Sequence, residues 1–141
     1  MSEPAVDSPA VPGRAVPSSG ILTAYGIGSI GMGVWVTVPG LLLLYYLTNI
    51  PADIMDELRQ REWFSLFDGG VASCEVHLCK PEPAIYTTLM QTCNLAYDES
   101  IFIDDNKVNA QAAYNLGITG ILYKNPKSFE RALRACGIEL D

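Results

Sequence analysis

Two adjacent carboxylates, Asp104 and Asp105, stand directly after an apolar segment, 100–103, that is predicted to be a strand. At the end of a strand, neighbouring carboxylates repel each other unless a cation or hydrogen bonds neutralise them. Mg²⁺ binds one or two carboxylates and keeps several of its waters, so this pair is a candidate magnesium site. The alternative interpretation is a turn in which Asp104, Asp105 and Asn106 cap the following helix.

A hydroxyl and a lysine complete a set of groups that would suit a phosphate. Thr48 follows the apolar run Leu41–Leu47, and Lys80 precedes Pro81-Glu82-Pro83, where two prolines restrict the backbone. Together with a metal ion they would offer a phosphoryl group one hydrogen-bond donor, one positive charge and one cation. Taken singly, Thr48 could instead cap the next helix, and Lys80 could be a solvated surface lysine.

These groups need strands that end at a common edge, and the hydrophobic pattern predicts such strands. From residue 41 onward, apolar runs alternate with helical segments, which is typical of βαβ units in a doubly wound parallel sheet. Strands are predicted at 41–47, 71–74, 100–103 and 118–123, and helices at 51–61, 82–92, 107–116 and 128–136. The last two helices each end at a glycine, Gly117 and Gly137. Ligands bind beyond the carboxyl ends of such strands, where Thr48 and Asp104 stand.

The three motifs, in this order, resemble the haloacid dehalogenase (HAD) superfamily of hydrolases and its bacterial phosphatase branch. The likeness covers residues 41–135. It rests on Thr48-Asn49, on the segment from Ser73 to Tyr86 (SCEVHLCKPEPAIY) and on the segment 102–106 (FIDDN). It implies a Rossmann-like α/β core and Mg²⁺-dependent hydrolysis of a small phosphorylated molecule through a covalent aspartyl intermediate.

The resemblance also implies roles for individual residues. Thr48 and Asn49 would bind the substrate phosphate, and Lys80 would neutralise the nucleophile and the transferring phosphoryl group. Asp104 and Asp105 would hold Mg²⁺.

Three further residues would support this site by the same resemblance. Asn109 would stabilise the metal-binding loop. Ser73 and Glu75 would shape the loop before the lysine rather than react.

The family's first motif, an Asp-x-Asp sequence after the first strand, has no counterpart here. Only Glu3 and Asp7 precede Thr48 among the acidic residues, and Asp7 has no predicted strand ahead of it. The residues before Thr48 are also too few for the helical cap usually inserted after that motif. The sequence therefore predicts a truncated hydrolase without a cap that is inactive or weakly active. The alternative is a non-catalytic half-domain that binds phosphate or Mg²⁺.

The N-terminal third carries almost no charge. The 141-residue chain has a net charge of −7, which argues against a nucleic-acid partner, yet residues 15–52 contain no charged side chain. Residues 1–20 are predicted to be a flexible tail because they hold four prolines and four serines. Residues 21–40 are apolar and glycine-rich, and their role is left open.

Three interpretations of this uncharged segment follow. A membrane span at 21–42 would be long enough, but its glycines and Pro39 disfavour a helix, so a cytoplasmic protein is the favoured prediction. The glycines at 26, 28 and 31 match a dinucleotide fingerprint only formally, because no helix is predicted to follow them. Alternatively, Val34–Val38 could replace the missing strand in the middle of the sheet. Without it, the open strand edges would favour self-association.

The cysteine pattern does not predict a metal centre. His77 lies between Cys74 and Cys79, but none of the four cysteines shows the two-residue spacing of a zinc or redox motif. Reduced thiols are the simpler prediction.

Overall fold

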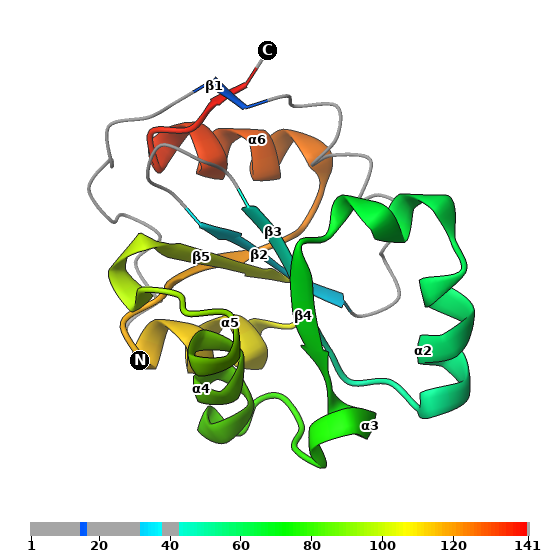
Figure 1. The fold of residues 1–141 in the computed structure, drawn as a ribbon. Helices are drawn as coiled ribbons and strands as arrows, with labels where there is room; N and C mark the ends of the chain where they lie inside the picture. Colours follow the sequence, from blue (N-terminus) through cyan, green and yellow to red (C-terminus); the bar gives the residue numbers. More distant parts are fainter. Residues whose placement is uncertain (1–14, 17–31, 38–42, 141) are drawn as a thin grey trace.

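The computed structural model describes residues 15–16, 32–37 and 43–140, which form a mixed α/β fold (Figure 1). The strands are β1 (Ala15–Val16), β2 (Met32–Thr37), β3 (Leu43–Thr48), β4 (Gly69–Ala72), β5 (Ser100–Asp104), β6 (Thr119–Leu122) and β7 (Glu139–Leu140). The helices are α2 (Ala52–Arg59), α3 (Ser73–Val76), α4 (Pro83–Thr92), α5 (Lys107–Asn115) and α6 (Pro126–Ala135), with 3₁₀ turns η1 (Glu62–Leu66) and η2 (Tyr97–Glu99). The predicted α/β class is confirmed.

The main sheet has five strands in the order β4-β3-β2-β5-β6, and it is not wholly parallel. β3 pairs parallel with β4, and β5 with β6, whereas β2 runs antiparallel to both of its neighbours. The predicted parallel sheet is therefore wrong at this one strand. Only residues 38–42 separate β2 from β3, and parallel strands need a crossover of a dozen or more residues.

β2 lies in the middle of the sheet, so the prediction of a replacement strand is confirmed for residues 34–37. Val34 is paired with Tyr46 on one side and with Ile103 on the other. The gap that would have exposed strand edges is thereby filled, and β4 and β6 form the edges of this sheet. β1 and β7 pair with each other in a separate two-stranded sheet.

The segment considered for a membrane span is only partly described. Its described part, Met32–Thr37, is strand β2, and the rest of 21–42 lies outside the described residues, as does the glycine fingerprint. Among the residues that the structure describes, no helix is long and apolar enough to cross a membrane.

The core divides between the two faces of the sheet because successive strand residues point to opposite sides. Ile101 and Ile103 of β5 pack against Phe129 and Leu133 of α6. Phe102, between them, faces the other way. It belongs to a second cluster with the inner sides of α4 and α5: Ile85, Tyr86, Leu89, Met90 and Ala113. A smaller cluster holds α2 against Tyr46.

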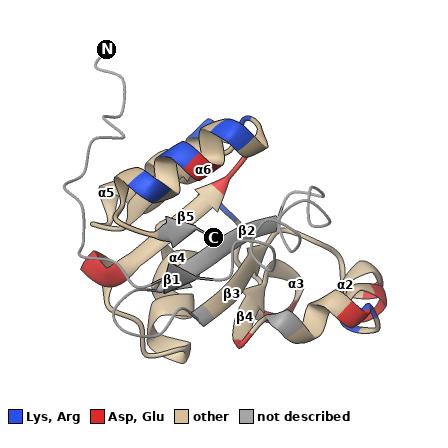
Figure 2. Ribbon diagram, turned by 90° about the horizontal axis from the view of Figure 1, so that it is seen from above, with Lys and Arg blue, Asp and Glu red and all other residues tan. Residues whose placement is uncertain are grey.

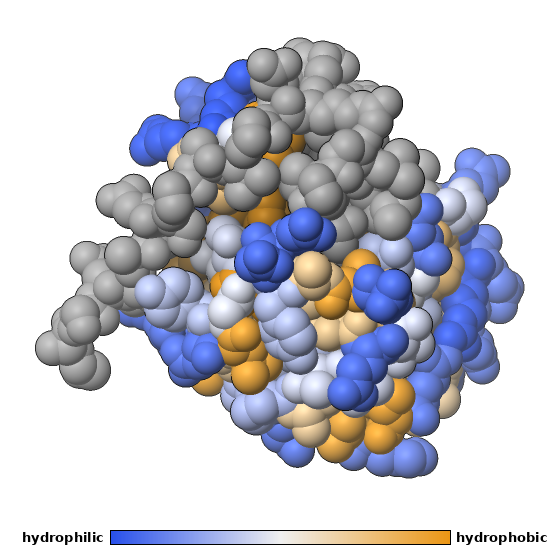
Figure 3. All heavy atoms as spheres, turned by 60° about the vertical axis from the view of Figure 1, so that its left-hand side comes forward, coloured by the Kyte–Doolittle hydropathy of each residue, from blue (hydrophilic) through white to orange (hydrophobic). Residues whose placement is uncertain are grey.

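Helix α6 shows how sequence pattern sets orientation. Its large apolar side chains, Phe129 and Leu133, are buried, while Lys127, Arg131 and Arg134 are exposed, and Figure 2 shows the basic positions along this helix in blue. Asn125 caps its first turn reciprocally with Ser128. On the face shown in Figure 3, hydrophilic side chains separate the apolar patches of the described residues.

Two local predictions are settled by backbone geometry. Gly117 follows α5 with φ of 91° and Gly137 follows α6 with φ of 80°, so both glycines end their helices as predicted. The strand predicted at 71–74 instead ends at Ala72, and Ser73 begins the single helical turn α3.

Candidate functional site

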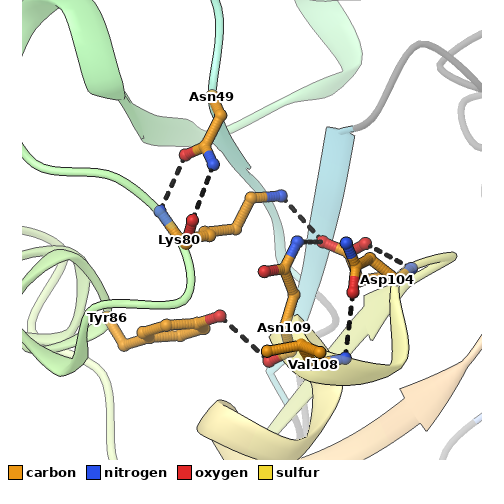
Figure 4. Close-up of polar contacts among 7 residues, drawn as sticks. Asn49, Lys80, Tyr86, Asp104, Val108 and Asn109 are labelled. Atoms are coloured by element: carbon orange, nitrogen blue, oxygen red, sulfur yellow. Dashed lines mark hydrogen bonds and ion pairs between the residues drawn. The ribbon is translucent and has the colours of Figure 1, made fainter.

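Four of the predicted site residues, Asn49, Lys80, Asp104 and Asn109, are linked by hydrogen bonds near the carboxyl ends of the parallel strands (Figure 4). Thr48 is the last residue of β3, and Asp104 is the last residue of β5. Lys80 lies in the loop before α4, and Asn109 lies in the first turns of α5. Because β2 separates β3 from β5, the ends of these two strands stand about 10 Å apart, which is two strand spacings.

Lys80 and Asp104 form a buried ion pair at the centre of this edge. The Lys80 Nζ donates to Asp104 Oδ2 over 2.7 Å, and both side chains are 1% exposed. The same Nζ lies 5.6 Å from the centre of the Phe102 ring, within range of a cation–π contact. Burial lowers the pKa of Lys80 below its usual value, and attraction to Asp104 opposes this shift. The sequence had assigned these two groups to different partners, but in the structure they bind each other.

The Asp104 carboxylate has further donors on both oxygens. Asn109 Nδ2 donates to Oδ2 over 3.2 Å, and the Asn106 backbone N–H donates to Oδ1 over 2.8 Å. The Asn106 side chain in turn accepts from the Val108 N–H and caps α5. Asp104 is thus fixed by the loop and the helix that follow it.

Asp105 is exposed next to this fixed carboxylate. Its pKa is raised, first by desolvation and then by a hydrogen bond and the negative charge of Asp104. A cation at this position would relieve the repulsion between the two carboxylates.

The donor set can be tested for its fit to Mg²⁺. In the described part of the chain, no group of three or more His, Cys, Asp or Glu side chains is placed to hold a metal. Mg²⁺ needs only one or two carboxylates with waters. Asp104 accepts three hydrogen bonds of the roughly four that a carboxylate can accept, and Asp105 adds a second carboxylate. A largely hydrated Mg²⁺ could be held by Asp105 together with the remaining acceptor position of Asp104, whereas the four free cysteines form no comparable cluster.

Thr48 carries an orphaned hydroxyl. It is 0% exposed, and its Oγ1 is the one buried side-chain oxygen or nitrogen among the described residues that lacks a hydrogen-bond partner. Such a group costs about 1–3 kcal/mol relative to a satisfied one. A phosphate oxygen could supply the missing partner, provided that the residues covering Thr48 move aside.

Replacing Thr48 by valine tests this hydroxyl directly. The substitution keeps the shape and removes the unsatisfied group, so we expect the ligand-free protein to gain about 1 kcal/mol of unfolding free energy. At the same time, the stabilisation by added inorganic phosphate should disappear in thermal unfolding scans. Thr88→Val, in which the lost hydroxyl bonds only to Ala84 O within α4, is the control and should leave the phosphate effect intact. A loss of stability in Thr48→Val would contradict the prediction.

Asn49, predicted to bind phosphate, directs its side chain elsewhere. Its Nδ2 donates to Lys80 O over 2.9 Å, and its Oδ1 accepts from Lys80 N over 2.8 Å. Nearby, Ser73 Oγ accepts from Ile50 N over 3.0 Å, which ties α3 to the end of β3. Glu75 pairs with Arg59 of α2.

Tyr86, to which the sequence assigned no role, contacts the candidate site. Its hydroxyl donates to Asn109 O over 2.9 Å, and its ring packs edge-on against Phe102 with centroids 5.3 Å apart. Desolvation, followed by the charge of Asp104, raises its pKa, so the phenol keeps its proton. The available signal was its position on the inner side of the helix that begins at Pro83.

A groove of about 460 Å³ lies beside the site, between the start of α4 and the exposed side of α5. It is lined by Pro81, Pro83, Lys107, Val108, Gln111, Ala112, Asn115 and Leu116. Its lining is mostly apolar, and Val108 is 60% exposed. Two of its lining residues, Pro81 and Lys107, stand one residue after Lys80 and two residues after Asp105 in sequence.

Known proteins are similar in sequence to part of this chain. Bifunctional epoxide hydrolase 2 of Mus musculus is 38% identical over 82 residues, which cover 58% of this chain and 14% of that protein. Sesquiterpene phosphatase astK of Aspergillus oryzae is 36% identical over 80 residues, which cover 55% of this chain and 40% of that protein. The chain thus spans less than half the length of these relatives.

A solved structure shares the fold. An uncharacterized protein from Corynebacterium glutamicum superimposes with a TM-score of 0.55 at 23% identity, covering 67% of this chain and 71% of that one. The model of the family "Haloacid dehalogenase-like hydrolase" matches residues 48–123, from the end of β3 to just beyond β6. The resemblance inferred from the motifs is confirmed, and the chain belongs to the haloacid dehalogenase-like hydrolase family.

Proposed function

We propose that this chain binds phosphate monoesters at the carboxyl edge of the sheet, where the HAD family binds them, and hydrolyses them only at a very low rate because it lacks the family's nucleophilic aspartate. The observation that carries the proposal is the buried Lys80–Asp104 pair, in which a desolvated ammonium is held at the strand ends. Burying such a pair costs several kcal/mol in desolvation. We therefore attribute the buried pair to a role in phosphate binding rather than to a contribution to stability. The doubly wound core would comprise residues 41–141 together with the central strand β2, with no cap.

The low rate follows from what stands between β3 and β5. The resemblance implies that, in other members of the family, the strand at this position is followed by a nucleophilic aspartate. Here the position is filled by β2, whose sequence MGVWVT contains no carboxylate. Loss of residues that act as a unit in covalent catalysis costs on the order of 10⁴–10⁶ in rate.

Mg²⁺ would be held by Asp104 and Asp105. When bound, it would supply positive charge to neutralise the phosphoryl oxygens. Of the chain's own residues, Asn109 and the Asn106 N–H keep Asp104 in place, Lys80 provides the fixed positive charge, and Thr48 would donate to a phosphate oxygen.

The groove beside α5 would accept the organic group of the ester. Its lining is mostly apolar. The name of one relative, sesquiterpene phosphatase, also refers to a compound with an apolar organic group. We therefore propose a monoester with an apolar organic group, whose phosphate lies near Lys80 and whose chain lies against Val108.

Binding and turnover should be measured separately on the full chain. Calorimetry with Mg²⁺ is expected to detect inorganic phosphate, and decyl phosphate more tightly, because about 0.8 kcal/mol accompanies each CH₂ that is buried. Hydrolysis of p-nitrophenyl phosphate is expected to be barely above the uncatalysed rate. Val108→Asn, which adds polarity but no charge, should weaken decyl phosphate but not inorganic phosphate. Absence of phosphate binding would refute the proposed site, and efficient turnover abolished by Asp104→Asn would refute the proposed loss of rate.

A further inference from the structure

We infer that Asn49 is a positioning residue: its side chain does not bind the substrate phosphate but holds the Lys80 backbone, and so places the lysine ammonium. This inference rests on the proposed phosphate site, where it explains how the end of β3 and the loop before α4 act together. Asn49 and Lys80 are 31 residues apart in sequence. The structure joins them by two hydrogen bonds, as Figure 4 shows.

The geometry of this contact uses both ends of the Asn49 amide. The Nδ2 donates to Lys80 O over 2.9 Å, and the Oδ1 accepts from Lys80 N over 2.8 Å. One side chain therefore satisfies the donor and the acceptor of a single residue, in the way that a neighbouring strand would. The second Nδ2 hydrogen is the only part of the amide group that these two bonds leave for another acceptor.

The position of Lys80 makes such a clamp necessary. Its side chain extends from the loop before α4 to the Asp104 carboxylate at the end of β5, and this side chain is 1% exposed. A long lysine side chain has about 2 kcal/mol of rotamer entropy, and its charge is costly to bury unless it meets Asp104 in good geometry. Because Lys80 lies in a loop, its ammonium can be held in one place only if the backbone of that loop is itself fixed.

Asn49 is well placed to fix it, since it follows a rigid element. It stands directly after Thr48, the last residue of the buried strand β3. The next residue, Ile50, is anchored through its backbone to Ser73 Oγ, with bonds of 3.0 and 3.3 Å. The clamp therefore connects the Lys80 loop to a strand end that is itself held on both sides of Asn49.

The competing assignment is direct contact between the Asn49 amide and phosphate, and a double-mutant cycle separates the two. Phosphate affinity would be measured by calorimetry in the wild type, Asn49→Ala, Lys80→Met/Asp104→Asn and the triple variant. The Lys80→Met/Asp104→Asn background leaves no buried charge unpaired. If Asn49 acts through Lys80, we expect Asn49→Ala to weaken inorganic phosphate about 10-fold in the wild type and less than 2-fold in that background. Equal weakening in both backgrounds would overturn the inference.

A second measurement needs no ligand. Amide hydrogen exchange at Lys80, followed by NMR, should accelerate about 10-fold in Asn49→Ala, because that N–H loses its acceptor. Asn115→Ala, which removes an exposed asparagine from the far end of α5, should leave it unchanged. Unchanged Lys80 exchange in Asn49→Ala would overturn the inference. If the wild type binds no phosphate, the proposed function fails, and the exchange rates alone decide whether the clamp exists.

Discussion

Replacing Lys80 by methionine is expected to lower the free energy of unfolding by about 3–5 kcal/mol, because it leaves the Asp104 carboxylate buried without its counter-ion. Methionine approximates the length of the lysine side chain, so loss of packing contributes little. The Asp104 oxygens would keep the bonds from Asn109 and from the Asn106 N–H, which do not neutralise the charge. Urea denaturation of the full chain, followed by far-UV circular dichroism, measures the change.

Two variants calibrate this result. Lys107→Met removes an exposed lysine and should change the unfolding free energy by less than about 0.5 kcal/mol. Lys80→Met/Asp104→Asn removes both charges, and it should be more stable than Lys80→Met alone because no buried charge is left unpaired. If Lys80→Met costs no more than Lys107→Met, the ammonium and the carboxylate do not form a buried pair in solution.

Replacing Gly120 by alanine is expected to cost about 2–3 kcal/mol, the second large effect. A Cβ built at this position would lie 2.5 Å from the carbonyl oxygen of Ala110, which belongs to the backbone of α5. Because no side chain can rotate to make room, the helix must move away from β6. Asn109 precedes Ala110 and donates to Asp104, so the displacement should also reach the candidate site.

The matched control is Gly69→Ala in β4. There the added Cβ would meet Tyr45 ring carbons at 3.5 Å, which is ordinary contact, so we expect a change below about 1 kcal/mol. Thermal unfolding compares the two variants, and the amide shift of Asn109 reports on the movement of α5. Equal stability of Gly120→Ala and Gly69→Ala would show that α5 does not approach the sheet as closely as the structure indicates.

Much of the fold could be predicted because local pattern and tertiary structure agree from residue 43 onward. The apolar residues Ile101–Ile103 form a strand whose alternate faces are both buried, and Gly117 ends α5 with a positive φ. The orientation of β2 was less accessible, since its polarity follows from the short connection to β3 rather than from its own residues. The strand predicted at 71–74 was placed two residues too late in the chain, because it runs from Gly69 to Ala72 and Ser73 begins α3, where its hydroxyl bonds to Ile50, a contact that no local pattern reveals.

The sequence could single out candidate site residues but not the contacts between them. Thr48, Lys80 and Asp104 could be recognised as polar groups next to strand ends or prolines. Their pairing depends on distances between segments that are far apart in sequence: Lys80 and Asp104 are 24 residues apart, and Asn49 and Lys80 are 31 residues apart. Whether an amide faces a ligand or a neighbouring backbone is decided only when the loops are placed.

The antiparallel direction of β2 determines at which position a nucleophilic residue would have to be introduced into this chain. In a parallel strand, the residue that reaches the carboxyl edge is the last one, and a designer would extend the strand beyond Thr37. Here Met32 is paired with Thr48, while Thr37 is paired with Ser100 at the opposite edge. An aspartate meant to stand among Thr48, Lys80 and Asp104 therefore belongs at the beginning of β2, at position 32 or 33. The second aspartate of the family's motif would then have to precede it in sequence rather than follow it.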